Sequence, residues 1–167
     1  MQLHSLAIGN LPLVPKFDSE PSAFDAIEGS TMREKVQRLE ETLRQYPQLP
    51  EQLTHHFADG VYARELFIPK DAVIVGKIHR FGHLNFLMKG DISVLTEHGI
   101  KRLKAPAVIK SSPGIKRAGY AHEDTIWITV HATTVTDLEK IEDQVICKTF
   151  DDFERIAADE VKQLEVA

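Results

Sequence analysis

The sequence predicts a mainly β protein, in which short strands form a barrel or sandwich and a helical segment precedes and follows it. Three observations indicate this fold class. Residues 53–135 consist of short β-rich runs that turn residues separate. Residues 30–52 and 136–167 carry helical periodicity instead. The length of 167 residues, with 43% hydrophobic and 27% charged residues, is typical of one globular domain.

Residues 1–29 are predicted to form an extended N-terminal arm. They contain Pro12, Pro15 and Pro21, and their apolar residues follow no sustained period. We expect such an arm to be ordered only where it packs against something, and a neighbouring subunit or another partner is the simplest surface for it.

Residues 30–52 are predicted to form the N-terminal helical segment. Thr31 and Glu34 have the spacing of a capping box, good helix formers follow over residues 33–45, and Pro47 ends the run. The apolar residues have heptad spacing: Met32, Val36, Leu39, Leu43 and Tyr46. Because this stripe covers only about two heptads, we expect the helix to pack against the barrel of its own chain.

The barrel region, residues 53–135, is predicted to contain eight strands, which glycines, prolines and polar turns separate. Their ranges are 61–68, 73–79, 83–89, 91–96, 100–104, 107–110, 116–121 and 125–131. In residues 136–167, the C-terminal helical segment, residues 137–144 form a short candidate helix and residues 150–164 place their apolar side chains on one face.

Strand alternation in residues 83–89 separates two kinds of side chain. His83 and Asn85 share one face with Leu87 and Lys89, whereas the other face is apolar and consists of Leu84, Phe86 and Met88. If the histidine face lines the barrel, the apolar face points outward and has to be covered. We expect the arm, the helix over residues 33–45 or a second subunit to cover it, and therefore expect a homo-oligomer.

Composition and charge exclude several classes of function. The formal net charge of −5 opposes sequence-independent binding of nucleic acid. There is no apolar run long enough for a membrane span and no secretory signal at the start, so we expect neither a membrane partner nor secretion. Cys147, the only cysteine, excludes an internal disulfide and a cysteine zinc cluster, and we expect it to be a small buried apolar group.

The run from Gly76 to Gly90 resembles the first signature motif of the cupin family. His79 falls on the second histidine of that motif, His83 on its glutamate and Gly90 on its final glycine, whereas Lys77 replaces the first histidine. Residues 112–117 resemble the second motif, with Arg117 at its histidine position. The resemblance implies that residues 53–135 form a cupin-like double-stranded β-helix, also called a jelly roll.

The same resemblance implies a metal site. Cupins usually hold a divalent transition metal, such as Zn, Fe, Mn or Ni, on three histidines and a carboxylate. His79 and His83 are therefore candidate ligands, and the alternatives are a metal-free polar cluster that lines the barrel or vestigial positions of the motif. A third ligand has to come from elsewhere. His131, at the end of a strand, is our candidate, and His55 and His56 are placed before the first strand, at the mouth of the barrel.

Basic residues at the two motifs indicate a second use of the barrel. Lys116 and Arg117, with Lys77 and the inward-facing Asn85, are candidates to bind a small anionic ligand, because arginine offers a planar pair of donors to carboxylates and phosphates. The alternative is that these basic groups form ion pairs with acidic residues of the chain, namely Glu65, Glu123 or Asp124.

Residues 54–57, 61–64 and 123–127 are similar to small cupin-like proteins of bacteriophages and prophages. This resemblance implies a viral protein in the host cytoplasm or in a virion. Two classes of function follow. The first is a non-enzymatic oligomeric module that contacts its own copies and other virion proteins. The second is a metal-dependent cupin enzyme, or a binder of a small anionic ligand such as a nucleotide, for which no catalytic residue can be named.

Overall fold

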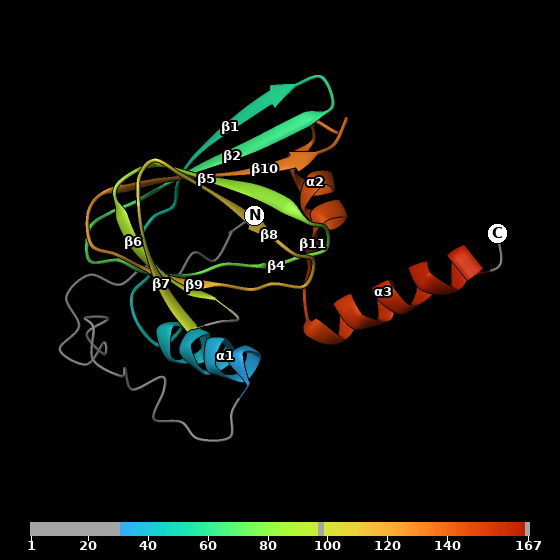
Figure 1. Ribbon diagram of the computed structural model, residues 1–167, viewed down its shortest axis with the longest axis horizontal. Coiled ribbons are helices and arrows are strands. Elements are labelled where there is room, and N and C mark those ends of the chain that lie inside the picture. Colours follow the sequence, from blue (N-terminus) through green and yellow to red (C-terminus); the bar gives the residue numbers. More distant parts are fainter. Residues whose placement is uncertain (1–30, 97–98, 166–167) are drawn as a thin grey trace.

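The computed structural model describes residues 31–96 and 99–165, and the side chains of residues 31–96 and 99–159. Two antiparallel sheets face each other, α1 lies along one of them, and α2 and α3 lie at one end (Figure 1). The predicted arm, residues 1–29, lies outside the described residues. In the described part of the chain, none of the helices has an apolar stretch long enough to cross a bilayer.

The order of the strands identifies the fold. From edge to edge, the first sheet contains β1 (Gln52–Ala58), β2 (Val61–Ile68), β10 (Thr125–Ala132), β5 (His83–Lys89) and β8 (Ala107–Ser111). The second contains β3 (Val73–Val75), β9 (Ala118–Ala121), β6 (Asp91–Thr96) and β7 (Gly99–Lys104). Apart from the added β1, early and late strands alternate in both sheets, as they do in a jelly roll. The predicted mainly β, cupin-like jelly roll is therefore confirmed.

Most of the strand positions predicted from turn residues are correct. The predicted ranges 61–68, 83–89 and 91–96 coincide with β2, β5 and β6. Gly90 connects β5 and β6 with a φ of 97°, and a Cβ atom there would lie 2.7 Å from the carbonyl oxygen of Asp124. Only glycine fits this turn without strain, which explains the final glycine of the first motif.

One strand prediction is wrong, and two strands of the structure were not predicted. The predicted strand 73–79 is divided into β3 and β4 (Ile78–His79), because the N–H of Gly76 donates to the carbonyl oxygen of Arg117 and β4 pairs instead with β11 (Ile146–Cys147). β11 was not predicted because it is only two residues long, and β1 was not predicted because its polar and apolar residues do not alternate regularly. β1 pairs with β2 at the edge of the sheet.

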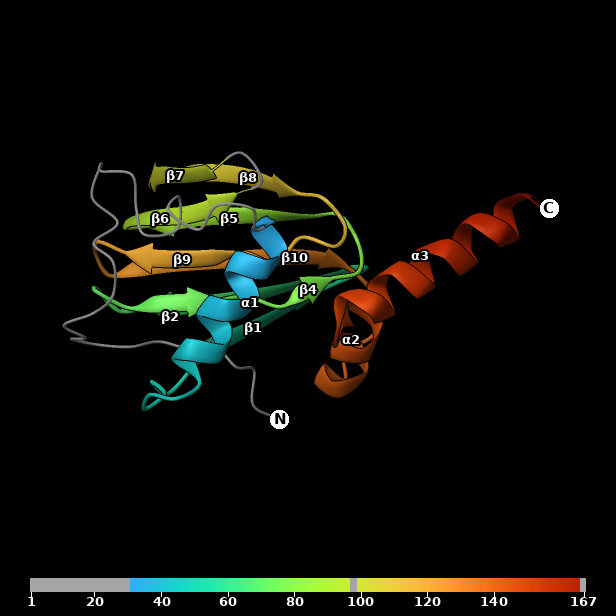
Figure 2. The same ribbon diagram turned by 90° about the horizontal axis from the view of Figure 1, so that it is seen from below.

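The helices lie near their predicted positions. In α1 (Met32–Leu43) both hydrogen bonds of the capping box are present, and Val36 and Leu43 pack against Val73 and Val75 of β3. The prediction that this helix packs on its own barrel is thus confirmed (Figure 2). Asp137 caps α2 (Leu138–Val145), and α3 (Phe150–Glu165) extends away from the barrel (Figure 1). Cys147 is buried, as expected.

The alternation predicted for β5 is confirmed up to Leu87, whereas Lys89, which was predicted on the same face, is exposed beside a register shift in the pairing with β10. His83, Asn85 and Leu87 are buried, whereas Leu84 and Met88 are exposed to 44% and 56%. Of the three expected covers for this outer face, α1 lies on the other sheet. Inside the barrel, the end of β2 and β5 that holds Ile68 and Leu87 is apolar. The polar interior is at the opposite end, where the candidate site lies.

Candidate functional site

Three histidines from three strands meet inside the barrel. His79 ends β4, His83 begins β5 and His131 lies near the end of β10, and each is less than 9% exposed. The ring centroids are 4.0 Å apart for His79 and His83 and 5.1 Å apart for the other two pairs. One ring nitrogen of each histidine lies within 4.8 Å of the others. The three predicted ligands therefore converge on one point.

Hydrogen bonds fix the backbone at His79 and the ring of His83. The N–H of Gly114 donates to the carbonyl oxygen of His79, and the next residue, Arg80, donates its N–H to the carbonyl oxygen of Val145 at the end of α2. Nδ1 of His83 lies 3.1 Å from the carbonyl oxygen of Phe81. Because a carbonyl oxygen can only accept, Nδ1 carries the proton and Nε2 keeps its lone pair for another partner.

Burial makes all three imidazoles neutral at pH 7. Loss of solvation lowers the pKa of His79 well below its ordinary value, and the neighbouring histidines act in the same direction. Burial likewise lowers the pKa of His83, although the carbonyl of Phe81 opposes it. The pKa of His131 is lowered from 6.5 to about 4, first by burial and then by His83 and Arg64. Neutral imidazoles are the form that binds a metal ion.

The cluster fits a transition metal ion in its chemistry. Nδ1 of His79 is buried and has no hydrogen-bond partner, and a buried polar atom in that state is costly unless something binds it. Three histidine nitrogens form the donor set of a metal site that keeps a coordination position open. Among the described residues, no carboxylate belongs to this cluster. The set thus differs from the three histidines and one carboxylate that the cupin resemblance implied.

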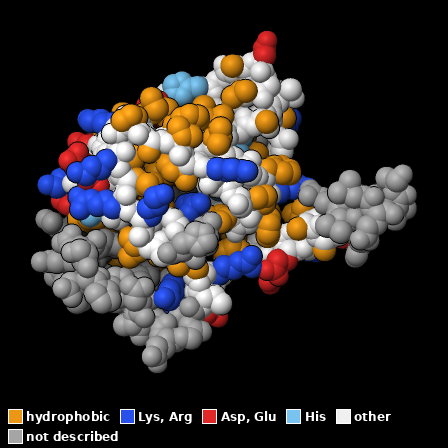
Figure 3. Space-filling model, viewed as in Figure 1, with side chains coloured by type: hydrophobic (Ala, Val, Ile, Leu, Met, Phe, Trp, Pro, Cys, Tyr) orange, Lys and Arg blue, Asp and Glu red, His pale blue; other side chains and the backbone are white. Residues whose placement is uncertain are grey.

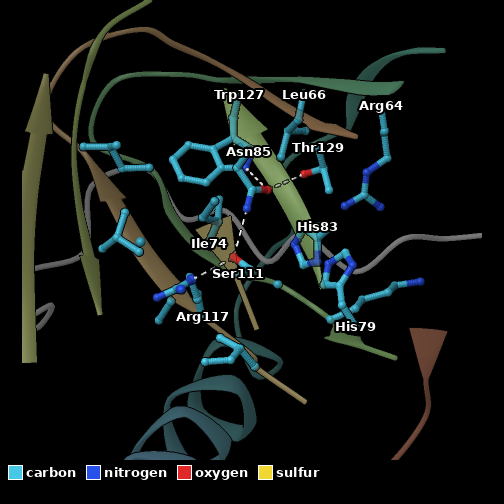
Figure 4. Close-up of a pocket in the computed structure, with 17 residues that line it drawn as sticks. Arg64, Leu66, Ile74, His79, His83, Asn85, Ser111, Arg117, Trp127 and Thr129 are labelled. Carbon is cyan, nitrogen blue, oxygen red and sulfur yellow. Dashed lines mark hydrogen bonds between the residues drawn. The ribbon is translucent and has the colours of Figure 1, made fainter. Parts of the chain in front are cut away.

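A cavity of ≈ 90 Å³ lies beside the cluster, between the two sheets (Figure 4). His79 and His83 line it, with Arg64, Lys77 and Arg117 as its charged residues. Its walls are otherwise uncharged, and no described carboxylate lines it. A cavity with this charge favours an anion over a cation.

Asn85 lies at the centre of a hydrogen-bond network in this cavity (Figure 4). Its Oδ1 accepts from Nε1 of Trp127 at 3.1 Å and from the hydroxyl of Thr129 at 2.9 Å, and its Nδ2 donates to Oγ of Ser111 at 2.9 Å. Nε of Arg117 also lies within 3.4 Å of that Ser111 oxygen. Asn85 therefore positions its neighbours and Arg117, and its amide is already occupied by the chain itself.

The predicted anion-binding lysines lie in ion pairs. Lys77 lines the cavity, but its ammonium group pairs with Glu142 of α2. Lys116 does not line the cavity and pairs with Glu40 of α1. Pairing with acidic residues was the alternative interpretation, but neither partner is one of those considered from the sequence.

The two other histidines proposed as third ligands lie outside the cluster. The placement of His55 and His56 before the first strand is wrong, because both belong to β1. Nδ1 of His55 lies 2.8 Å from the hydroxyl of Tyr62, and His56 lies on the outside with Glu65. These contacts leave His131 as the third member of the group.

Arg64 is the residue that sequence reasoning missed. It lies in the middle of β2 and its guanidinium group points into the barrel, toward the histidines (Figure 4). Burial lowers its pKa, and no carboxylate of the described residues forms an ion pair with it, although Glu51 and Glu142 act on it as more distant charges. Alternation could have found it, since Arg64 shares its strand face with Leu66 and Ile68, which lie inside.

No protein-family model matches the chain, and no curated protein does. Solved structures resemble it at low identity. An acetylacetone dioxygenase from Acinetobacter johnsonii is 19% identical with a TM-score of 0.40, over 49% of this chain and 58% of that chain. An RmlC-like cupin from Shewanella frigidimarina is 19% identical with a TM-score of 0.43, over 53% and 78%. KdgF from a Halomonas species is 18% identical with a TM-score of 0.43, over 53% and 82%.

The chain thus spans less than two thirds of the length of the dioxygenase. The comparisons give no support to the resemblance to bacteriophage proteins.

Proposed function

We propose that the barrel holds a divalent transition metal ion on His79, His83 and His131 and binds a small anionic ligand beside it, as an enzyme or a binder. The observation that carries this proposal is the convergence of three buried imidazole rings, one of which has a buried nitrogen without a partner. A negative charge on the ligand is supported by the lining of the adjoining cavity, which contains no described carboxylate.

The side chains around the cluster have different roles in this proposal. When bound, the metal ion supplies a Lewis acid with an open coordination position. Arg64 offers its guanidinium group to the anionic part of the ligand. Asn85 and Ser111 hold Arg117 at the wall of the cavity. Apolar side chains such as Ile74 restrict water on the remaining sides.

Metal analysis of the purified protein tests this function. We expect about one zinc, iron, manganese or nickel ion per chain, removable by a chelator and restored on reloading. The single variants His79→Ala, His83→Ala and His131→Ala should each lose it. His56→Ala is the matched control, because its ring is half exposed on the outside of β1, and it should keep the metal. Metal that survives in all three variants, or is absent from the parent after reloading, would contradict the proposal.

The exposed outer face of the first sheet supports a second candidate function, a non-enzymatic homo-oligomeric module. Met88 and Val108 are 56% and 64% exposed and lie on neighbouring strands, β5 and β8. Figure 3, in the same view as Figure 1, shows hydrophobic side chains gathered in the upper half of the molecule, where β5, β10 and β2 lie. A second copy could cover this face by placing the same face against it. Sedimentation velocity of the parent and of Met88→Asp and Val108→Asp tests it.

A further inference from the structure

A second cavity adjoins the histidine cluster from the side of α2. Its volume is ≈ 280 Å³, against ≈ 90 Å³ for the cavity between the sheets. It lies between β1 and β2 on one side and α2 and β11 on the other. Among the described residues, Arg64 and His79 alone line both cavities.

The cluster therefore forms a partition with one histidine on each side. His83 lines the inner cavity, His131 lines the outer cavity under α2, and His79 lines both. A ligand in either cavity can reach the cluster. The two cavities differ in size, and the outer one approaches the volume at which small organic molecules are commonly bound, roughly 300 Å³ and above.

The lining of the outer cavity is apolar toward α2 and basic at the cluster. Its apolar side chains are Leu53, Leu138, Ile141, Val145 and Ile146. At its inner end lie the charged guanidinium group of Arg64 and the neutral rings of His79 and His131. Nearby, the hydroxyl of Tyr62 and the ring of His55 form a hydrogen bond with each other.

Two carboxylates face this cavity, both from α2, and neither cancels the charge of Arg64. Glu142 pairs with Lys77, and Glu139 lies exposed in the first turn of the helix. No described carboxylate is within ion-pair distance of Arg64, which leaves its charge available to a ligand.

We propose that the outer cavity binds an organic carboxylate, with the acid group on Arg64 beside the histidine cluster and an apolar ring or chain against Leu138 and Ile146. This inference rests on the proposed function and changes one part of it: it names the class of the ligand and places it in the outer cavity under α2 instead of the cavity between the sheets. The binding itself requires no metal, because Arg64 supplies the positive charge and the apolar lining supplies the contact area.

Benzoate is a suitable probe, and isothermal titration of the full chain measures its binding, with benzyl alcohol as the uncharged analogue and inorganic phosphate as the anion without a ring. We expect benzoate to bind at one site and both analogues to bind at least about tenfold more weakly. Leu138→Trp, at the partly exposed mouth, should weaken benzoate about tenfold or more by filling the cavity. Arg64→Met should do the same by removing the charge.

Two variants serve as controls. Ile115→Phe narrows the inner cavity, and Val108→Trp makes a comparable exposed change far from both cavities. Both should bind benzoate within about twofold of the parent. Loss of binding in Ile115→Phe with full binding in Leu138→Trp would place the ligand between the sheets and overturn the proposal. Phosphate binding equal to that of benzoate, or no benzoate binding by the parent, would overturn it too.

The titration is run on chelator-treated protein and on protein reloaded with zinc. Benzoate binding by a chain that takes up no metal would contradict the proposed function and leave this inference standing. Metal uptake without benzoate binding would contradict this inference and leave the proposed metal site standing. Thermal unfolding followed by circular dichroism checks that each variant is folded, and Leu138→Trp keeps the test decisive if Arg64→Met does not fold.

Discussion

At the end of the first sheet where the histidines lie, the inner face is polar and the outer face is apolar, the opposite of the usual distribution of side chains in a soluble protein. On the inner face, His83, Asn85, Thr129 and His131 are polar and almost completely buried. On the outer face of the sheet, Leu84 and Met88 of β5 and Val108 of β8 are exposed, and Phe86 is half-buried. Burying polar groups and exposing a contiguous apolar face are both unfavourable.

A sheet that combines these two features is shaped by more than its own stability. Folding alone would favour apolar side chains inside and polar ones outside, as at the other end of the barrel, where Ile68 and Leu87 form the core. The inner face therefore indicates a ligand, and the outer face indicates a covering surface. Substitutions on each face and changes of pH, which differ in their expected effect on the free energy of unfolding, separate these two roles from ordinary packing.

The largest effect is expected from a pair of identical substitutions on opposite faces of β5. Leu87→Ala removes a fully buried side chain and should lower the free energy of unfolding by about 3 kcal/mol. Leu84→Ala, three residues earlier on the exposed face, should lower it by less than about 1 kcal/mol. Urea unfolding at pH 7 measures both. Equal losses would show that the outer face is packed within the chain itself and would remove the contrast between the faces.

The fold could be predicted from the sequence largely because its turns are local. Glycine and polar turn residues bound β5 and β6, and strand alternation then distinguished the two faces of β5. Two residues of the site, His79 and His83, could be predicted from the sequence because they are four residues apart across a turn, which brings them together. This part of the prediction depends only on neighbours in the chain.

The rest of the site depends on contacts between distant parts of the chain. His131 joins the cluster because β10 lies between β2 and β5, a strand order that no local pattern specifies. Lys116 is removed from the site by Glu40, a residue 76 positions away on α1. Arg64 was missed because an arginine on a strand is expected to be exposed to solvent unless the residues around it are known.

A smaller effect than that of Leu87→Ala is expected from acid. The pKa of His131 is lowered from 6.5 to about 4, so the unfolded chain takes up a proton in a range where the folded chain does not. Stability is therefore complete above about pH 6.5 and is lost as the pH falls toward 4, by about 2 kcal/mol between pH 7 and pH 5 from this group alone. The lowered pKa values of His79 and His83 act in the same direction.

Urea unfolding of chelator-treated protein at several pH values measures this dependence. His131→Phe should flatten the curve by about the same 2 kcal/mol, whereas Leu84→Ala, which removes no titratable group, should leave its slope unchanged. A curve that rises toward acid pH would mean that the cluster is protonated in the folded protein, and the neutral imidazoles required for metal binding would be absent.

The smallest effect on unfolding is expected on the outer face, from Met88→Asp and Val108→Asp. Since both side chains are more than half exposed, each change should alter the free energy of unfolding of the monomer by less than about 0.5 kcal/mol. The consequence should appear in association instead, because a second copy that covers this face would have to bury two carboxylates. Sedimentation velocity over a range of concentrations measures the mass.

Lys101→Asp, an exposed change on β7 of the other sheet, is the control for charge and should keep the mass of the parent. A parent that sediments as a monomer at every concentration would remove the homo-oligomeric module from consideration. A loss of stability in Met88→Asp without any change in mass would assign the cover to residues 1–30 of the same chain. The outer face would then belong to the packing of one subunit, and only the inner face would remain as a surface selected for binding.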